Sequence, residues 1–407
     1  MNSASASNGA GRSYDIVVFG ATGFTGKLTA EYLLRSPDSQ RIKLAIAGRN
    51  SSKLEATRQQ LQADSGQGQV DTIVADSNDY TSLVQMAAQA RVVITTVGPY
   101  LKYGEPLVRA CVETGTHYVD LTGEPEFVDS LDFQFQEAAA AKQIKIINSC
   151  GFDSIPHDLG ALYTVHELNR LLGPERAAKV PMTVEGFVQA HGDLSGGTWH
   201  SAITQFSRLR EYQKKRKEWR KQRGTRPGDR RRTRVMRPRL YRVNAFDAWA
   251  CPFPTIDPQV VKRTAAARSE YGPDFVYGHY VLVRKLPKLI GGILGAGGVV
   301  VLSQFKFSRE RLLKWRDPGR GPSEQKRERS WFRVHFIGEA DGLHVWTEVT
   351  GGDPGYGETS KMLAESALCL ALDQDLPANY GVVTPGAGMG DALLQRLQRA
   401  GIEFRTL

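Results

Sequence analysis

Short apolar runs alternate with amphipathic stretches through the first third of the chain. Glycine, proline or polar residues bound each run, which is the pattern of buried strands. The intervening stretches have the spacing of helices, so the segment predicts an α/β fold: a doubly wound parallel sheet of the Rossmann type. The expected strands are residues 15–19, 44–47, 72–75, 92–97, 118–121 and 145–148.

The pattern changes after Cys150. Residues 155–172 read as a helix, 182–190 as a strand, and a further helix begins at Thr198. Two strands of alternating apolar and polar residues, 331–337 and 344–349, flank Asp341-Gly342, a strong hairpin signal. This region therefore predicts a second, α+β domain with an antiparallel sheet.

The expected domain organisation follows from these patterns. The 407 residues are too many for one ordinary core and suit two packed domains. We expect a disordered leader without a signal peptide, a Rossmann domain, an α+β substrate or dimerisation domain, and a C-terminal segment that packs back on the Rossmann domain. Their bounds are 1–13, 14–150, 151–380 and 381–407.

The four cysteines, Cys111, Cys150, Cys251 and Cys369, are far apart in the sequence. They form no CxxC pair and no Cys/His ligand spacing, so we expect reduced thiols, no metal site and a cytoplasmic protein.

The net charge of +10 is concentrated in one segment. Residues 208–242 contain 17 Lys/Arg and 3 Asp/Glu, with Tyr212, Trp219 and Tyr241 interleaved. One interpretation is an acidic partner: an anionic membrane, an acyl carrier protein or nucleic acid, the last disfavoured because no nucleic-acid-binding module accompanies the segment. The other is a solvated helix and loop.

Residues 289–302 are uncharged and include five glycines. The run is short for a membrane span and weak as a helix. Arg284, Lys285 and Lys288 precede it, and Lys306 and Arg309 follow, which suits an interfacial patch on anionic lipid across residues 284–309. A membrane surface at the inner face of the plasma membrane, a lipid-substrate entrance, an internal contact and a homodimer contact all stay open.

A glycine-rich loop follows the first strand: Gly20-Ala-Thr-Gly23-Phe-Thr-Gly26. Glycines allow a tight turn and close approach of a pyrophosphate, and free N–H groups at the next helix meet its charge. The strand–loop–helix setting predicts a dinucleotide site.

The residue after strand 2 distinguishes NAD from NADP. An acidic side chain there would bind the ribose 2′-hydroxyl, whereas this chain has Arg49, followed by Ser51, Ser52 and Lys53. A guanidinium suits a 2′-phosphate, so we expect NADP(H). The alternative is a solvated Arg and Lys that open a surface helix. Ser51 or Ser52 is the expected cap of this helix.

Strand 4 ends in Thr96-Val97-Gly98-Pro99-Tyr100 at the edge that binds ligands in this architecture. Tyr100 or Tyr103 either orients substrate and donates a proton or only packs. Asp76 lies near the adenine or caps a helix. The expected cofactor contacts are Gly20, Thr22, Gly23, Phe24, Thr25, Gly26, Arg49, Ser51, Lys53, Asp76, Val97, Gly98, Pro99 and Tyr100.

The sequence resembles the saccharopine dehydrogenase-like oxidoreductases. The most specific match is Cys150-Gly-Phe-Asp-Ser-Ile-Pro-His-Asp158. Other matching segments span nearly the whole chain: 18–26, 47–49, 97–100, 118–124, 195–198 and 384–391. Within the family, the chain is most similar to trans-acting enoyl reductases of polyketide-lipid assembly.

This resemblance implies an NADP-dependent reductase acting on a lipid-like or carrier-bound intermediate in lipid or glycolipid biosynthesis. A saccharopine-type amino-acid reductase and a non-catalytic NADPH-binding protein of a lipid surface are the alternatives.

Two groups of polar residues are further candidates for the site. Asp153, Ser154 and His157 follow strand 6 and are candidates for a polar cluster near the nicotinamide, with His157 as a proton donor; capping and packing are the alternative. Ser195-Gly-Gly-Thr198 either binds an anion or caps a helix.

Overall fold

The structure is a computed structural model that describes residues 11–66, 69–192, 196–223, 231–315 and 321–407. Most of the expected leader, residues 1–10, lies outside the described residues. Arg12, which we had placed in the leader, is instead anchored. Its guanidinium donates to the Ala87, Ala88, Ala90, Thr114 and Gly115 carbonyls and to Thr116 Oγ1.

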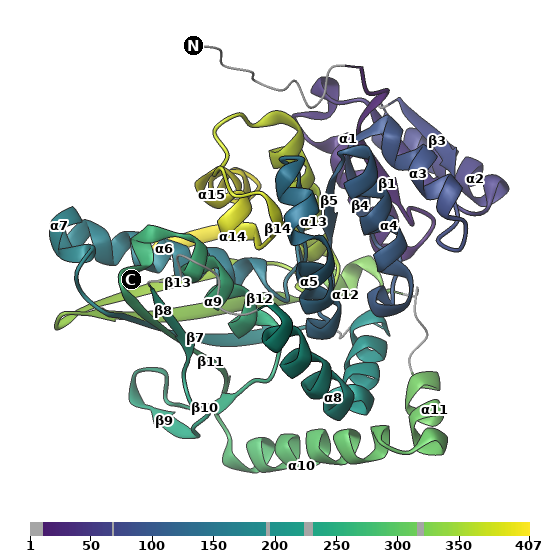
Figure 1. Cartoon of the computed structure of the whole chain (residues 1–407). Helices are drawn as coiled ribbons and strands as arrows, with labels where there is room; N and C mark the ends of the chain where they lie inside the picture. The colour runs from purple at the N-terminus through teal and green to yellow at the C-terminus, as the bar shows by residue number, and fades with distance from the viewer. Residues whose placement is uncertain (1–10, 67–68, 193–195, 224–230, 316–320) are drawn as a thin grey trace.

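Sheet A is a seven-stranded parallel sheet in the order β14-β6-β5-β4-β1-β2-β3 (Figure 1). The six strands expected from the sequence are present, and this confirms the Rossmann-type fold. The strands are β1 (Tyr14–Phe19), β2 (Leu44–Gly48), β3 (Val70–Val74), β4 (Ala90–Thr95), β5 (His117–Asp120), β6 (Lys145–Ile147) and β14 (Gly381–Val383).

Helices cover both faces of sheet A. Ile16 and Val18 face the core beneath α1, α2 and α13, whereas Val17 and Phe19 face the core beneath α3, α4 and α5. This alternation follows from the two-residue period of a strand. The helices are α1 (Phe24–Arg35), α2 (Ser51–Ser65), α3 (Tyr80–Gln89), α4 (Tyr100–Thr114), α5 (Pro125–Ala141) and α13 (Gly357–Leu372).

Sheet B forms the second domain, with strand order β15-β13-β12-β7-β11-β10-β9 and β8 paired to β11. We expected an antiparallel sheet, but β11 runs parallel to β7 and to β8, so the sheet is mixed. Long excursions between these strands let the chain re-enter in the same direction. The strands are β7 (Met182–His191), β8 (Arg232–Val235), β9 (Tyr241–Val243), β10 (Ala248–Pro252), β11 (Asp274–Val283), β12 (Trp331–Ala340), β13 (Leu343–Gly351) and β15 (Glu403–Thr406).

The hairpin expected at Asp341-Gly342 is confirmed, since β12 and β13 pair antiparallel around it. Both residues have positive φ, 49° and 77°, as a type I′ turn requires.

The remaining helices surround the two sheets. They are α6 (Ile155–Leu172), α7 (Pro174–Ala177), α8 (Gly196–Arg223), α9 (Asp257–Ala267), α10 (Leu286–Ser303), α11 (Lys306–Lys314), α12 (Glu324–Glu328), α14 (Pro385–Gly388) and α15 (Gly390–Arg399), with 3₁₀ turns at Ser39–Arg41, Asn244–Phe246 and Ser269–Tyr271.

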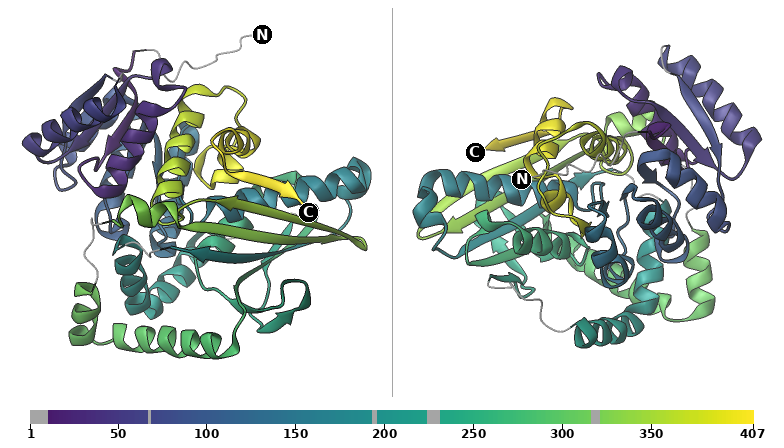
Figure 2. Two further views of the ribbon diagram at one scale, coloured as in Figure 1. Left: turned by 180° about the vertical axis from the view of Figure 1, so that it is seen from behind. Right: turned by 45° about the horizontal axis from the view of Figure 1, so that its top comes forward.

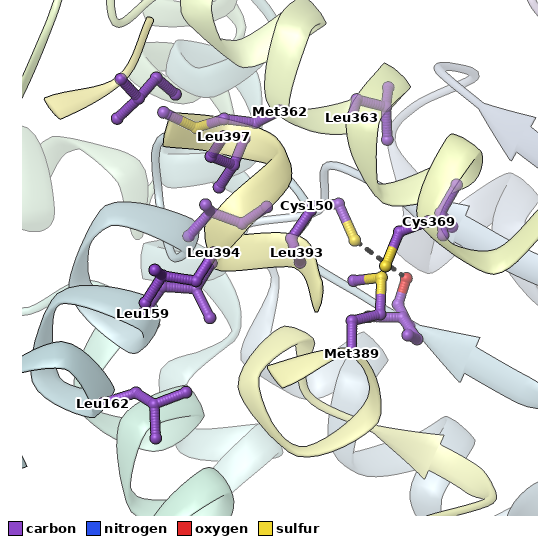
Figure 3. Close-up of a cluster of buried hydrophobic side chains, with 14 of the residues drawn as sticks. Cys150, Leu159, Leu162, Met362, Leu363, Cys369, Met389, Leu393, Leu394 and Leu397 are labelled. Atoms are coloured by element: carbon purple, nitrogen blue, oxygen red, sulfur yellow. Dashed lines mark hydrogen bonds between the residues drawn. The ribbon is translucent and has the colours of Figure 1, made fainter. Parts of the chain in front are cut away.

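One hydrophobic core joins the two domains. It extends from Ile16 and Val18 of sheet A to Val334 and Phe336 of sheet B. Figure 3 shows the part between α6, α13 and α15, where Cys150 and Cys369 lie as free thiols among leucines and methionines. Burial raises the pKa of Cys150, so its thiol stays protonated. The domains are therefore packed as one body rather than linked loosely.

The C-terminal segment contributes to both sheets. β14 extends sheet A beside β6, in line with packing on the Rossmann domain. β15, however, pairs with β13 at the edge of sheet B. Residues 381–407 thus connect the two domains (Figure 2).

Candidate cofactor and catalytic site

The glycine loop turns sharply between β1 and α1. Gly20 has φ of 92°, and its N–H donates to the Ala47 carbonyl of β2. A Cβ on Gly26 would lie 2.4 Å from the Gly20 carbonyl oxygen and 2.7 Å from Thr96 Oγ1. Glycine at position 26 therefore lets α1 pack directly on the loop and on the end of β4.

The outer side of the loop is open. Thr22 and Gly23 are exposed, and Gly23 is the N-cap of α1 with no side-chain cap. Because the first N–H groups of a helix have no intrahelical partner, they are available to an anion. The loop has the shape and polarity that a pyrophosphate requires.

Phe24 connects the loop to the second domain. Its ring packs edge-on against Tyr356 at 4.9 Å, and the Arg327 guanidinium lies 5.8 Å from its centroid. A Cβ on Gly321 would also collide with this ring. The side chain of Phe24 thus holds the domains together, which leaves its backbone for the predicted cofactor contact.

Arg49 follows β2 and is exposed, as are Ser51 and Lys53 at the start of α2. A Cβ on the preceding Gly48 would lie 3.9 Å from Thr22 Oγ1, so this corner adjoins the glycine loop. The cap of α2 is Asn50, whose side chain accepts from Lys53 N at 2.8 Å. The prediction that Ser51 or Ser52 caps this helix is therefore wrong.

Asp76 lies after β3 and is half-buried. Its Oδ1 accepts from Asn78 N and Nδ2 at 2.9 and 3.2 Å. The cap of α3 is Asp79, so the capping alternative for Asp76 is wrong. Asp76 instead shapes the loop that follows β3.

The end of β4 contributes Val97, Gly98 and Pro99, of which Gly98 is exposed. Tyr100 begins α4 and is buried, and its hydroxyl donates to the Thr95 carbonyl at 3.1 Å. Burial raises its pKa well above the ordinary value. Tyr100 is therefore committed to the backbone and poorly suited as the proton donor that we considered.

Glu124 was not identified from the sequence. It is buried, and its two carboxylate oxygens accept from Tyr100 N at 3.2 Å and Leu101 N at 2.8 Å, at the start of α4. Oε1 also accepts from Ser201 Oγ of α8 at 2.9 Å. Glu124 thereby fixes the loop before α4 to the second domain.

Asp120 at the end of β5 organises the adjacent loops. Its carboxylate accepts from Thr122 N, Ser149 N, Asn148 Nδ2 and the Tyr118 hydroxyl. Burial raises its pKa to about 6 despite these bonds. The available signal was the acidic residues of 118–124, since Asp120 lies at the end of the strand and Glu124 in the loop that follows it.

Asp153 is half-buried in the turn between β6 and α6. Its Oδ2 lies 3.6 Å from the position of a Cβ on Gly123, beside the loop that Glu124 holds. No hydrogen-bond partner of its carboxyl occurs among the described residues, and burial raises its pKa. Burial disfavours the charged form of this carboxyl, so Asp153 is a candidate general acid at this edge of the sheet.

Ser154 and His157 do not join Asp153 in one cluster. The Ser154 hydroxyl donates to the Asp153 carbonyl at 2.5 Å. His157 is buried and faces Asp257 and His279 within the second domain. Burial lowers the pKa of His157 well below its ordinary value, so the ring is neutral and a poor acid.

The anion site considered at Ser195-Gly-Gly-Thr198 begins outside the described residues. Helix α8 starts at Gly196 and carries the first half of the basic segment. Arg208 pairs bidentately with Glu126 of α5, and Lys215 pairs with the same carboxylate at 3.1 Å. Part of the basic charge on α8 is thus neutralised within the chain.

Comparisons with known proteins support the class that the fold and the loop define, a dinucleotide-dependent oxidoreductase. Residues 16–147 match the saccharopine dehydrogenase NADP binding domain. A trans-acting enoyl reductase of Mycobacterium bovis is 35% identical over 97% of this chain and 98% of its own length. A saccharopine dehydrogenase-like oxidoreductase of Mus musculus is 34% identical over the same shares.

The chain belongs to the saccharopine dehydrogenase-like oxidoreductase family, as expected. A solved structure of the L-Glu-forming saccharopine dehydrogenase of Saccharomyces cerevisiae shares the fold, with a TM-score of 0.55 and 14% identity over 97% of this chain and 100% of that chain. The protein is an NADP-dependent oxidoreductase, and NADP(H) is its cofactor.

Arg49→Ala is expected to weaken NADPH binding by about tenfold or more, or about 1.4 kcal/mol, and to leave NADH binding unchanged. The reason is loss of the charged contact to the 2′-phosphate. Titration of both nucleotides by fluorescence or calorimetry measures the preference. Lys43→Ala, an exposed cation before β2, serves as the control. Equal loss for both nucleotides would contradict the role of Arg49.

Gly26→Ala is expected to weaken NADPH binding about tenfold and to destabilise the fold by about 1–3 kcal/mol. The added Cβ meets backbone atoms of Gly20, which must move and thereby displace the loop. Gly297→Ala in α10, where a Cβ meets no atom within 4 Å, is the control. Unchanged affinity and stability of the Gly26 variant would show that the loop is not packed as described.

Proposed function

We propose that the protein reduces a carbon–carbon double bond in a lipid-like or carrier-bound intermediate of lipid or glycolipid synthesis, at a membrane surface. The observation that carries the proposal is an exposed apolar helix, α10, which packs against α8. Helix α8 in turn contacts the loop of Gly123 and Glu124, at the edge of sheet A that carries Asp153, which we call the catalytic edge. The names of the related enoyl reductases give the reaction class.

Helix α10 is apolar and lies along one edge of the molecule (Figures 1 and 2). Its length and composition would allow it to cross a membrane, with a mean hydropathy of 1.7, yet only 11% of its 18 residues are buried. No Cβ placed on any of its five glycines would meet an atom within 4 Å. Exposed apolar surface of this extent marks a site of interaction.

Both ends of α10 are attached to the same side of the protein. Leu289 is buried near its start, and beyond its end Gln304 donates to the Phe206 carbonyl of α8 at 2.7 Å. A helix of 18 residues is about 27 Å long, slightly less than the apolar thickness of a bilayer. These attachments favour a helix that lies in the membrane interface rather than across it.

The residues after α10 extend this surface. Phe305, Phe307 and Trp315 are exposed among Lys306, Arg311 and other cations. Aromatic and basic side chains together suit the headgroup region of an anionic leaflet. We therefore propose a cytoplasmic protein that docks peripherally at the inner face of the plasma membrane through residues 284–315.

Helix α8 links the docking surface to the catalytic edge. It packs on α10 and α11, where the Trp199 indole donates to the Leu312 carbonyl at 2.7 Å. The same helix bonds Glu124 through Ser201 and the Gly123 carbonyl through Gln205. An acyl chain that leaves the membrane beside α10 would therefore meet α8, which extends to the loop beside Asp153.

Reduction of an enoyl group requires a hydride at the β-carbon and a proton at the α-carbon. Bound NADPH supplies the hydride. Among the predicted catalytic residues, Asp153 alone has an uncommitted acidic group, because Tyr100 donates to the backbone and His157 faces away. We assign proton donation to Asp153.

The acceptor is tested by NADPH oxidation with purified protein and anionic vesicles. We expect turnover with long-chain enoyl thioesters and little with 2-oxoglutarate, or with glutamate plus an aldehyde. Turnover of the amino-acid pair alone would instead identify a saccharopine-type reductase. Tight NADPH binding without turnover of either class would identify a non-catalytic protein.

Leu294→Glu combined with Phe307→Glu is expected to weaken binding to vesicles of mixed phosphatidylcholine and phosphatidylserine by more than about tenfold. These side chains are 70% and 71% exposed, so their loss removes lipid contact rather than core packing. Leu171→Glu, on an exposed turn of α6, is the control. Dimerisation of the wild type through α10, without vesicle binding, would contradict the proposal.

A further inference from the structure

Three residues from distant parts of the sequence meet inside the second domain. His157 lies in the first turn of α6, Asp257 is the first residue of α9, and His279 lies on β11. All three are more than nine-tenths buried. None was assigned to a metal site from the sequence, because their spacing of 100 and 22 residues matches no local ligand motif.

The three side chains are too far apart to form strong hydrogen bonds with one another. His157 Nε2 lies 3.7 Å from Asp257 Oδ1, and His279 Nε2 lies 3.5 Å from Asp257 Oδ2. One ligand atom from each residue lies within 4.8 Å of the others, and the two rings are nearly perpendicular at 4.7 Å. Around a zinc ion with bonds of about 2.0–2.1 Å, ligand atoms lie about 3.3 Å apart, so small side-chain rotations would complete the set.

The cluster also has unsatisfied polar atoms. Asp257 Oδ1 is buried without a hydrogen-bond partner. His157 Nδ1 has none either, but it is not the ring nitrogen that faces Asp257, so an ion held by Nε2 would not satisfy it. Such atoms are costly in a protein interior unless a ligand or ion satisfies them. Asp257 Oδ1 faces the His157 ring, so it points into the space that an ion would occupy.

Neighbouring groups would support the ligands. The Tyr277 hydroxyl lies 3.4 Å from His279 Nδ1, on the side of the ring away from Asp257. This contact orients the ring so that Nε2 faces the centre, as outer partners of metal-binding histidines do. Thr255 Oγ1 bonds Asp257 and lies 3.2 Å from His279 Nε2, so it or a water is placed for a fourth position.

We propose that His157, Asp257 and His279 bind one divalent transition-metal ion, with zinc the best match to two imidazoles and a carboxylate. The ion would join α6, α9 and β11 beneath the turn that carries Asp153. Because the site is closed to solvent, its role is to fix this turn and the domain core rather than to take part in hydride transfer.

The direct test is the metal content of protein purified without chelator from zinc-supplemented cells, with a Co²⁺ titration of the chelator-treated protein. We expect about one ion per chain and the visible absorption of four-coordinate Co²⁺. Less than about 0.1 ion per chain, with no Co²⁺ absorption, would overturn the proposal, and this result needs only the wild-type protein.

The ligand set is tested by Asp257→Asn and His279→Gln, each expected to lower metal content at least tenfold. His166→Gln is the matched control, since His166 also lies between two carboxylates, Glu270 at 3.8 Å and Asp391 at 3.4 Å, but is one-third exposed. Metal retained by both test variants, or lost by the control, would overturn the assignment. Should both variants fail to fold, the wild-type Co²⁺ spectrum still decides whether the ion is bound.

Discussion

Asp153→Asn is expected to lower kcat for enoyl reduction by about 10²- to 10⁴-fold, the usual contribution of a positioned general acid. The amide keeps the size of the side chain but cannot release a proton. NADPH affinity should change little, because Asp153 follows β6, which β5 and β4 separate from β1 and the glycine loop. Steady-state rates at saturating NADPH measure the effect.

The pH profile separates proton donation from a structural role. Burial raises the pKa of Asp153, and an acid acts only while protonated, so wild-type kcat should fall as pH rises through that raised pKa. The residual activity of Asp153→Asn should lack this fall. Asp375→Asn, an exposed carboxylate, is the control. A variant that keeps the wild-type profile would contradict the assignment of Asp153.

Arg396→Leu is expected to lower the free energy of unfolding by about 3 kcal/mol. Arg396 lies on α15 and is buried, where its guanidinium pairs with Asp38, Glu365 and Asp373 at 2.6–3.2 Å. Removing the cation takes this counter-charge from Glu365 and Asp373, while Asp38 keeps its pair with Arg41. The loss falls at the low end for buried ion pairs because Asp38 and Asp373 still contact water.

The matched control for this prediction is Arg399→Leu, one turn later on α15 and exposed. Its effect should stay within about 0.5 kcal/mol. Urea unfolding monitored by circular dichroism measures both variants. If Arg396→Leu lowers the free energy of unfolding by less than about 1 kcal/mol, the packing of its leucines, and not this ion-pair network, stabilises α15.

The Rossmann strands were predictable because each is a local apolar run. β14 was not, since Gly381–Val383 is only three residues long and pairs with β6 more than 230 residues away. The same limit applies to sheet B. Its hairpin was visible at Asp341-Gly342, whereas the parallel pairing of β11 with β7 depends on the path of the intervening chain.

The cofactor loop could be placed from sequence because glycine positions report a backbone constraint directly. The roles of the candidate catalytic residues could not be predicted in this way. Tyr100, Asp153 and His157 each follow a strand, yet only packing shows that Tyr100 donates to Thr95 and that His157 faces Asp257. Glu124 gains its role from Ser201, which belongs to the other domain.

Charge and hydropathy along the sequence likewise did not show which surfaces are free to contact a partner. The basic segment suggested an external partner, but Glu126 and Asp129 of α5 neutralise Arg208, Lys215 and Arg216. The apolar run 289–302 left four kinds of contact open. The exposure of α10 favours a surface partner, because burial is a tertiary property that composition alone does not determine.

The most direct measurement is deuterium transfer from NADPH labelled at C4 to a long-chain enoyl thioester on anionic vesicles. Mass spectrometry of the product should show one deuterium on the saturated chain with wild-type protein and almost none with Asp153→Asn. Unlabelled or unreduced lipid, from wild-type protein that still binds NADPH tightly, would contradict the proposed reductase activity.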